Sequence, residues 1–272
     1  MRKVSGQDSV FDELFYDGDD VIFNLIYRIR EDEKSQIYTD DRLYICAQSS
    51  PDLPVWLYMK GIPSGSERDT LFALLVKIFA HNADVHINMQ EPYASEILPV
   101  LAKEIDENVT FRTYTNMNVY ACYTLNKVQE HGSMIRVEKH YIPQIKRLIG
   151  QMSMDAEHIE LSDTEAQAYA ERNAESPTLY LWRDKDEIAS MARIAHINDR
   201  YARINTVVTE RNLRCRGYAK MLVGKLCESL LANGITPMLY ADRSYPASNA
   251  AYQRIGFEKV GEITEYYLDK ND

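Results

Sequence analysis

Apolar residues along the chain recur at two spacings, one typical of helices and the other of strands. The clearest helical pattern follows Gly217, with a stripe made of Ala219, Leu222, Val223, Leu226 and Leu230. This spacing of three and four residues predicts one long helix with a single buried face. The pair Asn233 and Gly234 predicts where that helix ends, since glycine commonly follows a helix C-terminus.

Shorter apolar runs predict strands, and strands and helices come in two similar cycles. The first cycle predicts a helix over Phe11–Arg30, strands at 42–48 and 55–61, a helix at 66–82, a strand at 84–90, a helix, and a strand at 118–125. The second predicts a strand at 134–140, helices at 142–152 and 163–173, strands at 178–182, 188–197 and 200–209, the long helix, a strand at 237–242, a helix, and a strand at 266–268. This order predicts a mixed α/β sandwich.

A polar stretch with a glycine, Asn126–Ser133, interrupts the pattern between the two cycles. We place a domain boundary there, with one α/β domain over residues 1–130 and a second over 134–272. A chain of 272 residues with 45% apolar residues can bury the cores that two such domains need.

The net charge of −10 narrows the choice of partners. An acidic surface disfavours nucleic acid, whose binding needs clustered cations, and favours a cationic or amine-bearing partner. The chain contains no signal-like apolar segment and no long apolar run, so we expect a cytoplasmic protein without a membrane partner. Four cysteines without CxxC spacing predict reduced thiols and no zinc or other metal site.

One polar segment does not fit a plain solvated surface. Arg211, Arg214 and Arg216 come directly before Gly217 and the long helix. The start of a helix presents unpaired N–H groups, and glycine lets the backbone approach an anion, so this segment predicts a phosphate site. The chain has neither G-x-G-x-x-G nor G-x-x-x-x-G-K-[ST]. The stretch GIPSGSERDT comes nearest to the second motif, but we interpret it as a turn with Ser66 as the helix N-cap.

Two motifs in this second half resemble those of the GCN5-related N-acetyltransferase (GNAT) superfamily. Arg214-x-x-Gly217-x-Ala219 follows the apolar strand INTVVT and is similar to the family's pyrophosphate loop, [QR]-x-x-G-x-[GA]. The segment Leu239–Glu262 resembles the late motif of the FR47-like branch, with P-x-S-N followed by Y-x-x-I-G-F. The resemblance covers Met134–Leu268.

The resemblance implies the acyl-CoA N-acyltransferase fold, a mostly antiparallel mixed sheet flanked by helices, and acetyl-CoA as cofactor. The strand before the loop would hold the pantetheine arm, and the amides of the loop would hold the pyrophosphate. The implied cofactor-binding residues are Val207, Val208, Thr209, Arg214, Cys215, Arg216, Gly217, Tyr218, Ala219 and Asn249. Three positions depart from the family's pattern: Glu210 replaces a common proline, Cys215 a common glycine, and Tyr245 an asparagine.

Tyr252 occupies the position of the family's general acid, which protonates the departing thiolate. The other interpretation is a tyrosine that packs a helix onto the sheet. Glu210 is the first candidate for the base that accepts the amine proton, followed by His196 and Asp199, and water remains an alternative. No histidine is adjacent in sequence to activate Cys215 as a nucleophile, which favours direct attack by the amine.

The sequence therefore predicts an acetyl-CoA-dependent N-acetyltransferase that acts on a primary amine of a small molecule or peptide. The alternatives are a CoA-binding or sensor protein of the same fold with little or no turnover, and an interaction module. The first half lacks both motifs. We interpret it either as a degenerate copy of the same unit in tandem or as an unrelated α/β domain.

Overall fold

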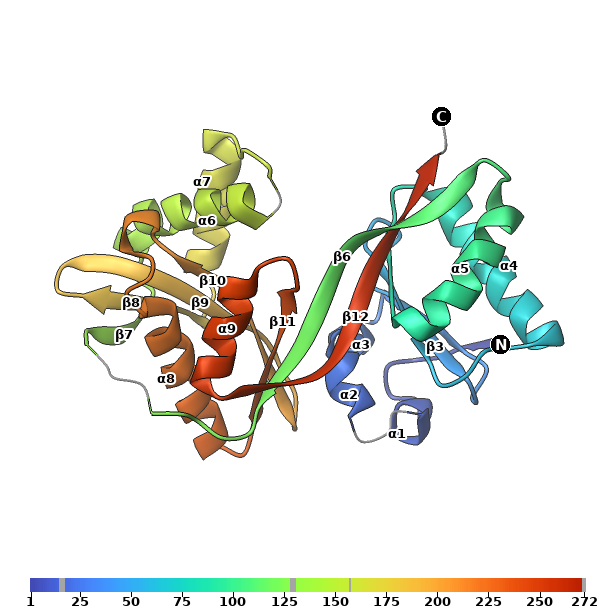
Figure 1. The fold of residues 1–272 in the computed structure, drawn as a ribbon, viewed down its shortest axis with the longest axis horizontal. Helices are drawn as coiled ribbons and strands as arrows, with labels where there is room; N and C mark the ends of the chain where they lie inside the picture. Colours follow the sequence, from blue (N-terminus) through green and yellow to red (C-terminus); the bar gives the residue numbers. More distant parts are fainter. Residues whose placement is uncertain (15–17, 128–130, 157, 271–272) are drawn as a thin grey trace. The chain divides into compact units, whose positions relative to one another are not determined.

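A computed structural model describes residues 1–14, 18–127, 131–156 and 158–270 (Figure 1). Parts of the predicted helix over Phe11–Arg30 and of the predicted boundary at Asn126–Ser133 lie outside the described residues. The structure confirms the predicted fold class, a mixed and mostly antiparallel sheet flanked by helices.

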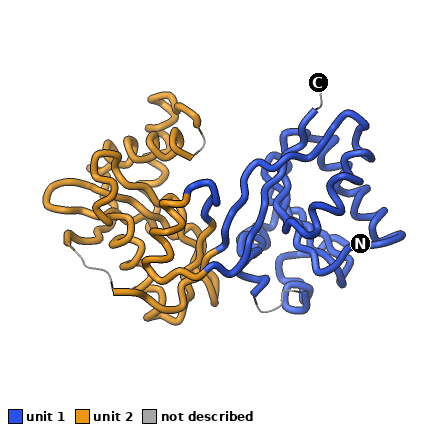
Figure 2. Tube along the Cα trace, in the orientation of Figure 1, with its two compact units in different colours: residues 1–119, 241–245, 259–272 blue, residues 120–240, 246–258 orange. Residues whose placement is uncertain are grey.

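The chain forms two compact units (Figure 2). Unit 1 comprises residues 1–119, 241–245 and 259–272, and unit 2 comprises residues 120–240 and 246–258. The sequence pattern predicts a single boundary near residue 130. The contacts also place two later segments, residues 241–245 and 259–272, with unit 1. The second of these belongs to β12 (Phe257–Lys270), which pairs with β5 (Ile87–Met89) through Thr264 opposite Met89.

Unit 1 begins with short helices and then alternates strands and helices. Its helices are α1 (Val10–Leu14), α2 (Asp19–Ile22), α3 (Asn24–Arg30), α4 (Gly65–His81) and α5 (Glu91–Ile105). Its other strands are β1 (Arg2–Lys3), β2 (Gln36–Thr39), β3 (Tyr44–Gln48), β4 (Val55–Met59) and β6 (Val109–Cys122). The strand order is β1-β2-β3-β4-β5-β12-β6, with β4 and β5 parallel.

Three local predictions for unit 1 were wrong. The predicted long helix over Phe11–Arg30 is three short helices, with Gly18 at a φ of 102° before α2. Strand β2 was missed, because only one of its four residues, Ile37, is both apolar and buried. The N-cap of α4 is Ser64 and not Ser66, because the helix already begins at Gly65.

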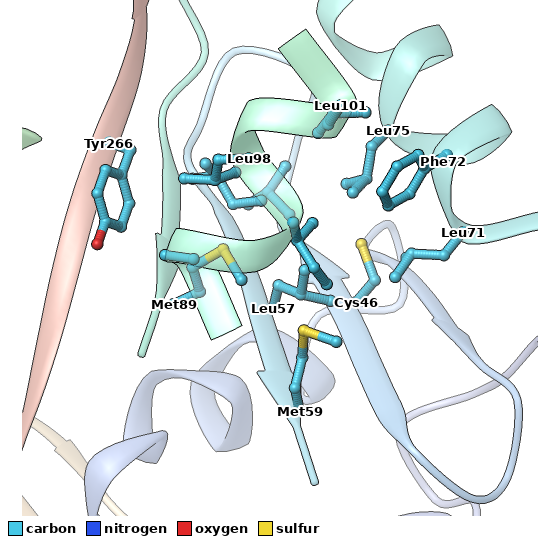
Figure 3. Close-up of a cluster of buried hydrophobic side chains, with 14 of the residues drawn as sticks. Cys46, Leu57, Met59, Leu71, Phe72, Leu75, Met89, Leu98, Leu101 and Tyr266 are labelled. Carbon is cyan, nitrogen blue, oxygen red and sulfur yellow. The ribbon is translucent and has the colours of Figure 1, made fainter. Parts of the chain in front are cut away.

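Buried side chains from β3, β4, β5, α4 and α5 form the core of unit 1 (Figure 3). Tyr266 of β12 joins this core, and its hydroxyl donates a hydrogen bond of 3.0 Å to Glu91 Oε2. Burying one large apolar side chain stabilises a fold by about 1.5–3 kcal/mol. The last strand of the chain therefore contributes both pairing and packing to unit 1.

Unit 2 has helices on both faces of its sheet (Figure 1). Its strands are β7 (Ser133–Arg136), β8 (Leu179–Asp184), β9 (Glu187–Ile197), β10 (Tyr201–Thr209) and β11 (Thr236–Asp242). Its helices are α6 (Ile142–Ala156), α7 (Asp163–Ala174), α8 (Tyr218–Ala232) and α9 (Pro246–Ile255), with 3₁₀ turns η1 (Lys139–Tyr141) and η2 (Arg211–Leu213). The strand order is β11-β10-β9-β8-β7, and only β10 and β11 are parallel.

The two faces of the unit 2 sheet carry different helices (Figure 1). Helix α6 packs Ile145 and Leu148 against Leu181, Met191 and Val208 of the sheet. Helix α8 runs along the other face and ends at Asn233, followed by Gly234 with a φ of 74°, as the sequence predicts.

The two units repeat one order of elements. In unit 1 the order is β2-β3-β4-α4-β5-α5-β6, and in unit 2 it is β8-β9-β10-α8-β11-α9, after which the chain continues into β12, most of which belongs to unit 1. In both, three antiparallel strands are followed by a helix and by a strand parallel to the third.

Candidate functional site

Strand β10 pairs with β11 only at its beginning. The parallel register joins Tyr201–Arg203 to Thr236–Met238, and the last six residues of β10 lie outside it. On its other side, β10 carries a bulge, because Asn205 lies opposite Arg193 while Val208 lies opposite Met191. Bulges bend a strand and increase its twist. The end of β10 therefore separates from β11 and leaves main-chain groups of β10 without a partner on that strand.

The loop after β10 turns twice through left-handed conformations before α8. Cys215 has a φ of 63° and Gly217, the N-cap of α8, has a φ of 84°. A Cβ added at Gly217 would meet no atom within 4 Å, so this side of the loop is open. The first N–H groups of a helix lack intrahelical acceptors and carry partial positive charge. An anion at this loop would use the open space beside Gly217 and the first N–H groups of α8.

Two of the three loop arginines are already paired within unit 2. Nη2 of Arg211 lies 2.6 Å from Oδ1 of Asp155 on α6, and Arg214 contacts the other oxygen of the same carboxylate. The hydrogen bond from Arg214, helped by Arg211, holds the pKa of Asp155 below its usual value. The sequence-based interpretation that these charges serve a phosphate is therefore incomplete, because Asp155 neutralises part of the cluster.

Several predicted cofactor-binding side chains are engaged inside the protein. Val208 packs against α6, and the hydroxyl of Tyr218 donates a hydrogen bond of 2.7 Å to Asp184, which raises the pKa of Tyr218. Oδ1 of the buried Asn249 accepts a hydrogen bond of 3.0 Å from Tyr120. These residues can offer an external ligand mainly their main-chain groups.

Residues 144–257 match the model of the acetyltransferase (GNAT) family. The GNAT match runs from α6 to the first residue of β12, so it includes the bulged strand, the loop and α9. It covers less than half of the chain and lies within the second half, as the motifs predicted. GNAT proteins generally take their acyl group from acetyl-CoA, so the match supports an acetyltransferase.

Solved structures, some of them named as GNAT proteins, share the fold of almost the whole chain. An acetyltransferase of the GNAT family from Colwellia psychrerythraea aligns with a TM-score of 0.58 and 14% identity, covering 99% of each chain. A Drosophila protein aligns with a TM-score of 0.63 and 12% identity, covering 99% of this chain and 97% of its own. A GCN5-related N-acetyltransferase from Kribbella flavida gives 0.60 and 11%, covering 92% of this chain and 94% of its own. No curated protein matches the chain.

Tyr252, the predicted general acid, lies in a group of aromatic rings. Its ring centroid is 6.4 Å from that of Tyr120 and 5.9 Å from that of Phe257. Burial raises the pKa of Tyr252 to about 12, so the hydroxyl stays protonated at neutral pH. The geometry is compatible with both interpretations of Tyr252, a packing residue and a proton donor.

Glu210 is held by three donors. Its carboxylate accepts hydrogen bonds from the side chains of Arg147 and Gln151, the latter at 2.6 Å, and from the main-chain N–H of Arg211 at 3.2 Å. Burial acts to raise the pKa of Glu210, but the hydrogen bonds from Gln151 and Arg147 outweigh it and keep the pKa below its usual value. A carboxylate bound in this way suits a structural acceptor better than a base.

The other two candidate bases lie toward the beginning of β10, and Arg203, which is opposite His196, is two residues before Asn205. His196 is buried on β9 opposite Arg203, and Asp199 is exposed in the hairpin that precedes β10. Since a strand rises by about 3.3 Å per residue, the two ends of β10 are roughly 26 Å apart. The structure therefore does not bring Asp199 to the loop at Gly217.

Sequence reasoning missed the support that α6 gives to the loop. Arg147, Gln151 and Asp155 hold Glu210, Arg211 and Arg214. These three residues are spaced four apart on one helix, so they share one face. That polar stripe was a signal in the sequence, but its partners sixty residues later could not be read from it.

We expect Glu210→Gln to lower stability more than turnover. The substitution removes the carboxylate charge that Arg147 and Gln151 bind. We expect it to lower the free energy of unfolding by about 1–2 kcal/mol at neutral pH. Because the pKa of Glu210 is lowered in the folded state, this stability is present above the unfolded pKa near 4.5 and is lost as the pH falls through the folded value. Urea unfolding of both proteins at pH 7 and at pH 3 measures the difference, which should shrink at pH 3.

The same variant separates a structural acceptor from a base. If Glu210 were the base, kcat would fall by about 10²-fold or more and the acidic limb of the pH–rate profile would change.

Among the described residues no helix could span a membrane. No cluster of three His, Cys, Asp or Glu side chains in that part of the chain could hold a metal ion.

Proposed function

We propose that the protein is an acetyl-CoA-dependent N-acetyltransferase that moves the acetyl group directly to a primary amine. The observation that carries this proposal is the combination in unit 2 of a bulged β10, separated from β11 at its end, with a loop that has open space beside Gly217 at the start of α8. The strand offers hydrogen-bonding groups for an extended amide chain, and the loop offers donors for a diphosphate.

The residues present fit acetyl-CoA through the main chain. The amides from Arg214 to Ala219 would hold the pyrophosphate, and the backbone of Val207 and Val208 would pair with the pantetheine arm. The carbonyl oxygen of Thr209 already accepts a hydrogen bond of 3.2 Å from Nε of Arg214, which makes Thr209 a weaker contact. When bound, acetyl-CoA supplies the thioester whose acetyl group is transferred.

Within this proposal, Tyr252 donates a proton to the leaving thiolate. Its raised pKa keeps the phenol protonated at neutral pH, as a donor requires. The amine must be neutral when it attacks. Because the contacts of Glu210 occupy its carboxylate, we assign the removal of the amine proton to water and leave Glu210 the task of positioning the loop against α6.

Two measurements test the proposed function. Release of free thiol from acetyl-CoA with a panel of primary amines measures turnover, and thermal stabilisation by CoA measures binding. Stabilisation together with amine-dependent thiol release is the expected result. Stabilisation without release from any amine would favour the alternative, a CoA-binding or sensor protein. Absence of both would contradict each of these functions.

We further infer that unit 1 is a degenerate copy of unit 2, and that unit 2 belongs to the FR47-like branch through its Y-x-x-I-G-F segment. The repeated order of elements supports the first inference, as does the short parallel register of β4 with β5, which joins only Val55 to Ile87 and Trp56 to Asn88. The loop after β4 reaches α4 through Gly65 with a φ of 54°, but it has no counterpart of Arg214. In this interpretation unit 1 has kept the fold and lost the cofactor site.

A further inference from the structure

Polar side chains occupy one face of the unit 2 sheet beside the bulge. Arg193 of β9 lies opposite Asn205 of β10, and His196 lies opposite Arg203. Residues directly opposite each other in an antiparallel pair project from the same face. A second register shift, between Arg203 and Ile204, skips Ala195 of β9 and so keeps both pairs on this face. The two pairs contain two arginines, one histidine and one asparagine.

This face is the one that α6 and α7 cover further along the sheet. Arg193 also lies opposite Leu179 of β8, and Met191 lies opposite Leu181. Leu179, Leu181 and Met191 all pack with α6 and α7. Since side chains alternate along β9, Arg193 shares the face of Met191, whereas Ile194 faces the other side and lines a pocket beside α8.

Arg193 is partly buried and lacks a counter-ion. Its Nε is buried without a hydrogen-bond partner, and its guanidinium forms no ion pair with any residue that the structure describes. Removing part of a guanidinium from water without a partner costs free energy, and buried charges in proteins are normally paired. An anion bound beside Arg193 would supply the missing partner.

The position of Arg193 matches the reacting end of the proposed cofactor. With the pyrophosphate at the loop and the pantetheine arm along Val208 and Val207, the thioester would lie before Val207. Asn205, which is opposite Arg193, is the residue just before the bulge at Thr206 and Val207. Arg193 is thus one strand away from the place where an amine would attack.

We propose that the amine acceptor carries a carboxylate and that Arg193 binds this carboxylate. The substrates would then be amino acids or closely related amines with a free carboxylate. This inference rests on the proposed acetyltransferase function. It differs from the expectation drawn from the net charge of −10, which favoured cationic acceptors. Arg193 is a cation on this face of the sheet with no ion pair among the described residues, and a charge beside the site decides which end of an acceptor is bound.

Matched acceptors test the proposal on the full chain. Thiol release is measured for a panel of amino acids and for the amide of each one, which keeps the amine and removes the carboxylate charge. We expect the acids to be preferred by about 10- to 100-fold in kcat/KM, the range for charge-assisted hydrogen bonds. Arg193→Gln should raise KM for the acids by about that factor and so abolish their preference over the amides.

Three further measurements separate binding from structure. Arg193→Lys should restore part of the preference, and Arg183→Gln, which removes an exposed arginine from β8, should leave it intact. Calorimetry with the N-acetyl derivative of the preferred amino acid should show binding to the wild type and a loss of about 10-fold or more in Arg193→Gln. Thermal stability of Arg193→Gln should equal or exceed that of the wild type, since an unpaired charge is removed; an arginine with a structural role would lower it.

The outcomes distinguish the two proposals. The carboxylate inference would be overturned if kcat/KM for the amides equalled or exceeded that for the acids. It would also be overturned if Arg193→Gln kept the preference for acids. Either result would leave the acetyltransferase function intact. CoA binding with no turnover of any amino acid would overturn it as well. Failure of the wild type to bind CoA would instead refute the proposed function, and the carboxylate inference, which rests on it, would fall with it.

Discussion

Replacing Tyr252 with phenylalanine is expected to lower kcat by about 10²- to 10⁴-fold, the usual contribution of a general acid. The substitution keeps the ring that packs near Tyr120 and Phe257 and deletes only the hydroxyl. Affinity for CoA and the melting temperature should therefore change little. Because burial raises the pKa of Tyr252 to about 12, its ionisation should cause no loss of rate below pH 10.

Tyr120→Phe is the matched control for this prediction. It removes a hydroxyl from the same aromatic group, but that hydroxyl donates a hydrogen bond to Asn249. We expect a stability loss of about 1 kcal/mol and nearly normal turnover. Pre-steady-state thiol release should accompany both assays, so that a slow product release cannot hide the chemical step. Wild-type chemistry in Tyr252→Phe would show that Tyr252 only packs α9 and that another group protonates the thiolate.

Gly217→Val is expected to remove most of the thermal stabilisation that acetyl-CoA gives. For the wild type this stabilisation should reach about 3 kcal/mol when the ligand is at a hundredfold over its Kd. The new side chain would project into the open space in front of the loop, where we place the pyrophosphate. Its Cβ would meet no protein atom within 4 Å, so the fold should persist. The positive φ of 84° should lower the free energy of unfolding by about 1–2 kcal/mol.

Gly65→Val provides the matched control, because it carries the same backbone cost in unit 1. Gly65 also has a positive φ, of 54°, and a Cβ there also meets no atom within 4 Å. If unit 1 has lost its cofactor site, this variant should be destabilised like Gly217→Val but keep the full shift with acetyl-CoA. Equal loss of the shift in both variants would mean that backbone strain explains it, and an unchanged shift in Gly217→Val would place the phosphate site elsewhere.

Much of the fold and part of the site could be predicted because the signals are local. The stripe from Ala219 to Leu230 sets the long helix, and the pattern around Gly217 marks its start whatever surrounds it. Where local signals were weak, prediction failed. β2 buries a single apolar residue, and β12 was recognised only at its last apolar residues although it extends from Phe257 to Lys270. The predicted division at residues 130–134 stays a prediction about folding units.

The sequence by itself determined most of the order of strands and helices, apart from β2 and the short helices at the start of unit 1, and the loop that opens α8, since these depend on spacing, glycine and the apolar period. Only the tertiary structure decided which side chains meet. Asp155 forms ion pairs with two of the loop arginines, and Gln151 and Arg147 donate hydrogen bonds to Glu210. The register of β9 and β10 places Arg193 opposite Asn205, beside a bulge. Such pairings join segments far apart in the chain. They follow from register and packing, because a shift of one residue in a strand would turn each side chain to the opposite face.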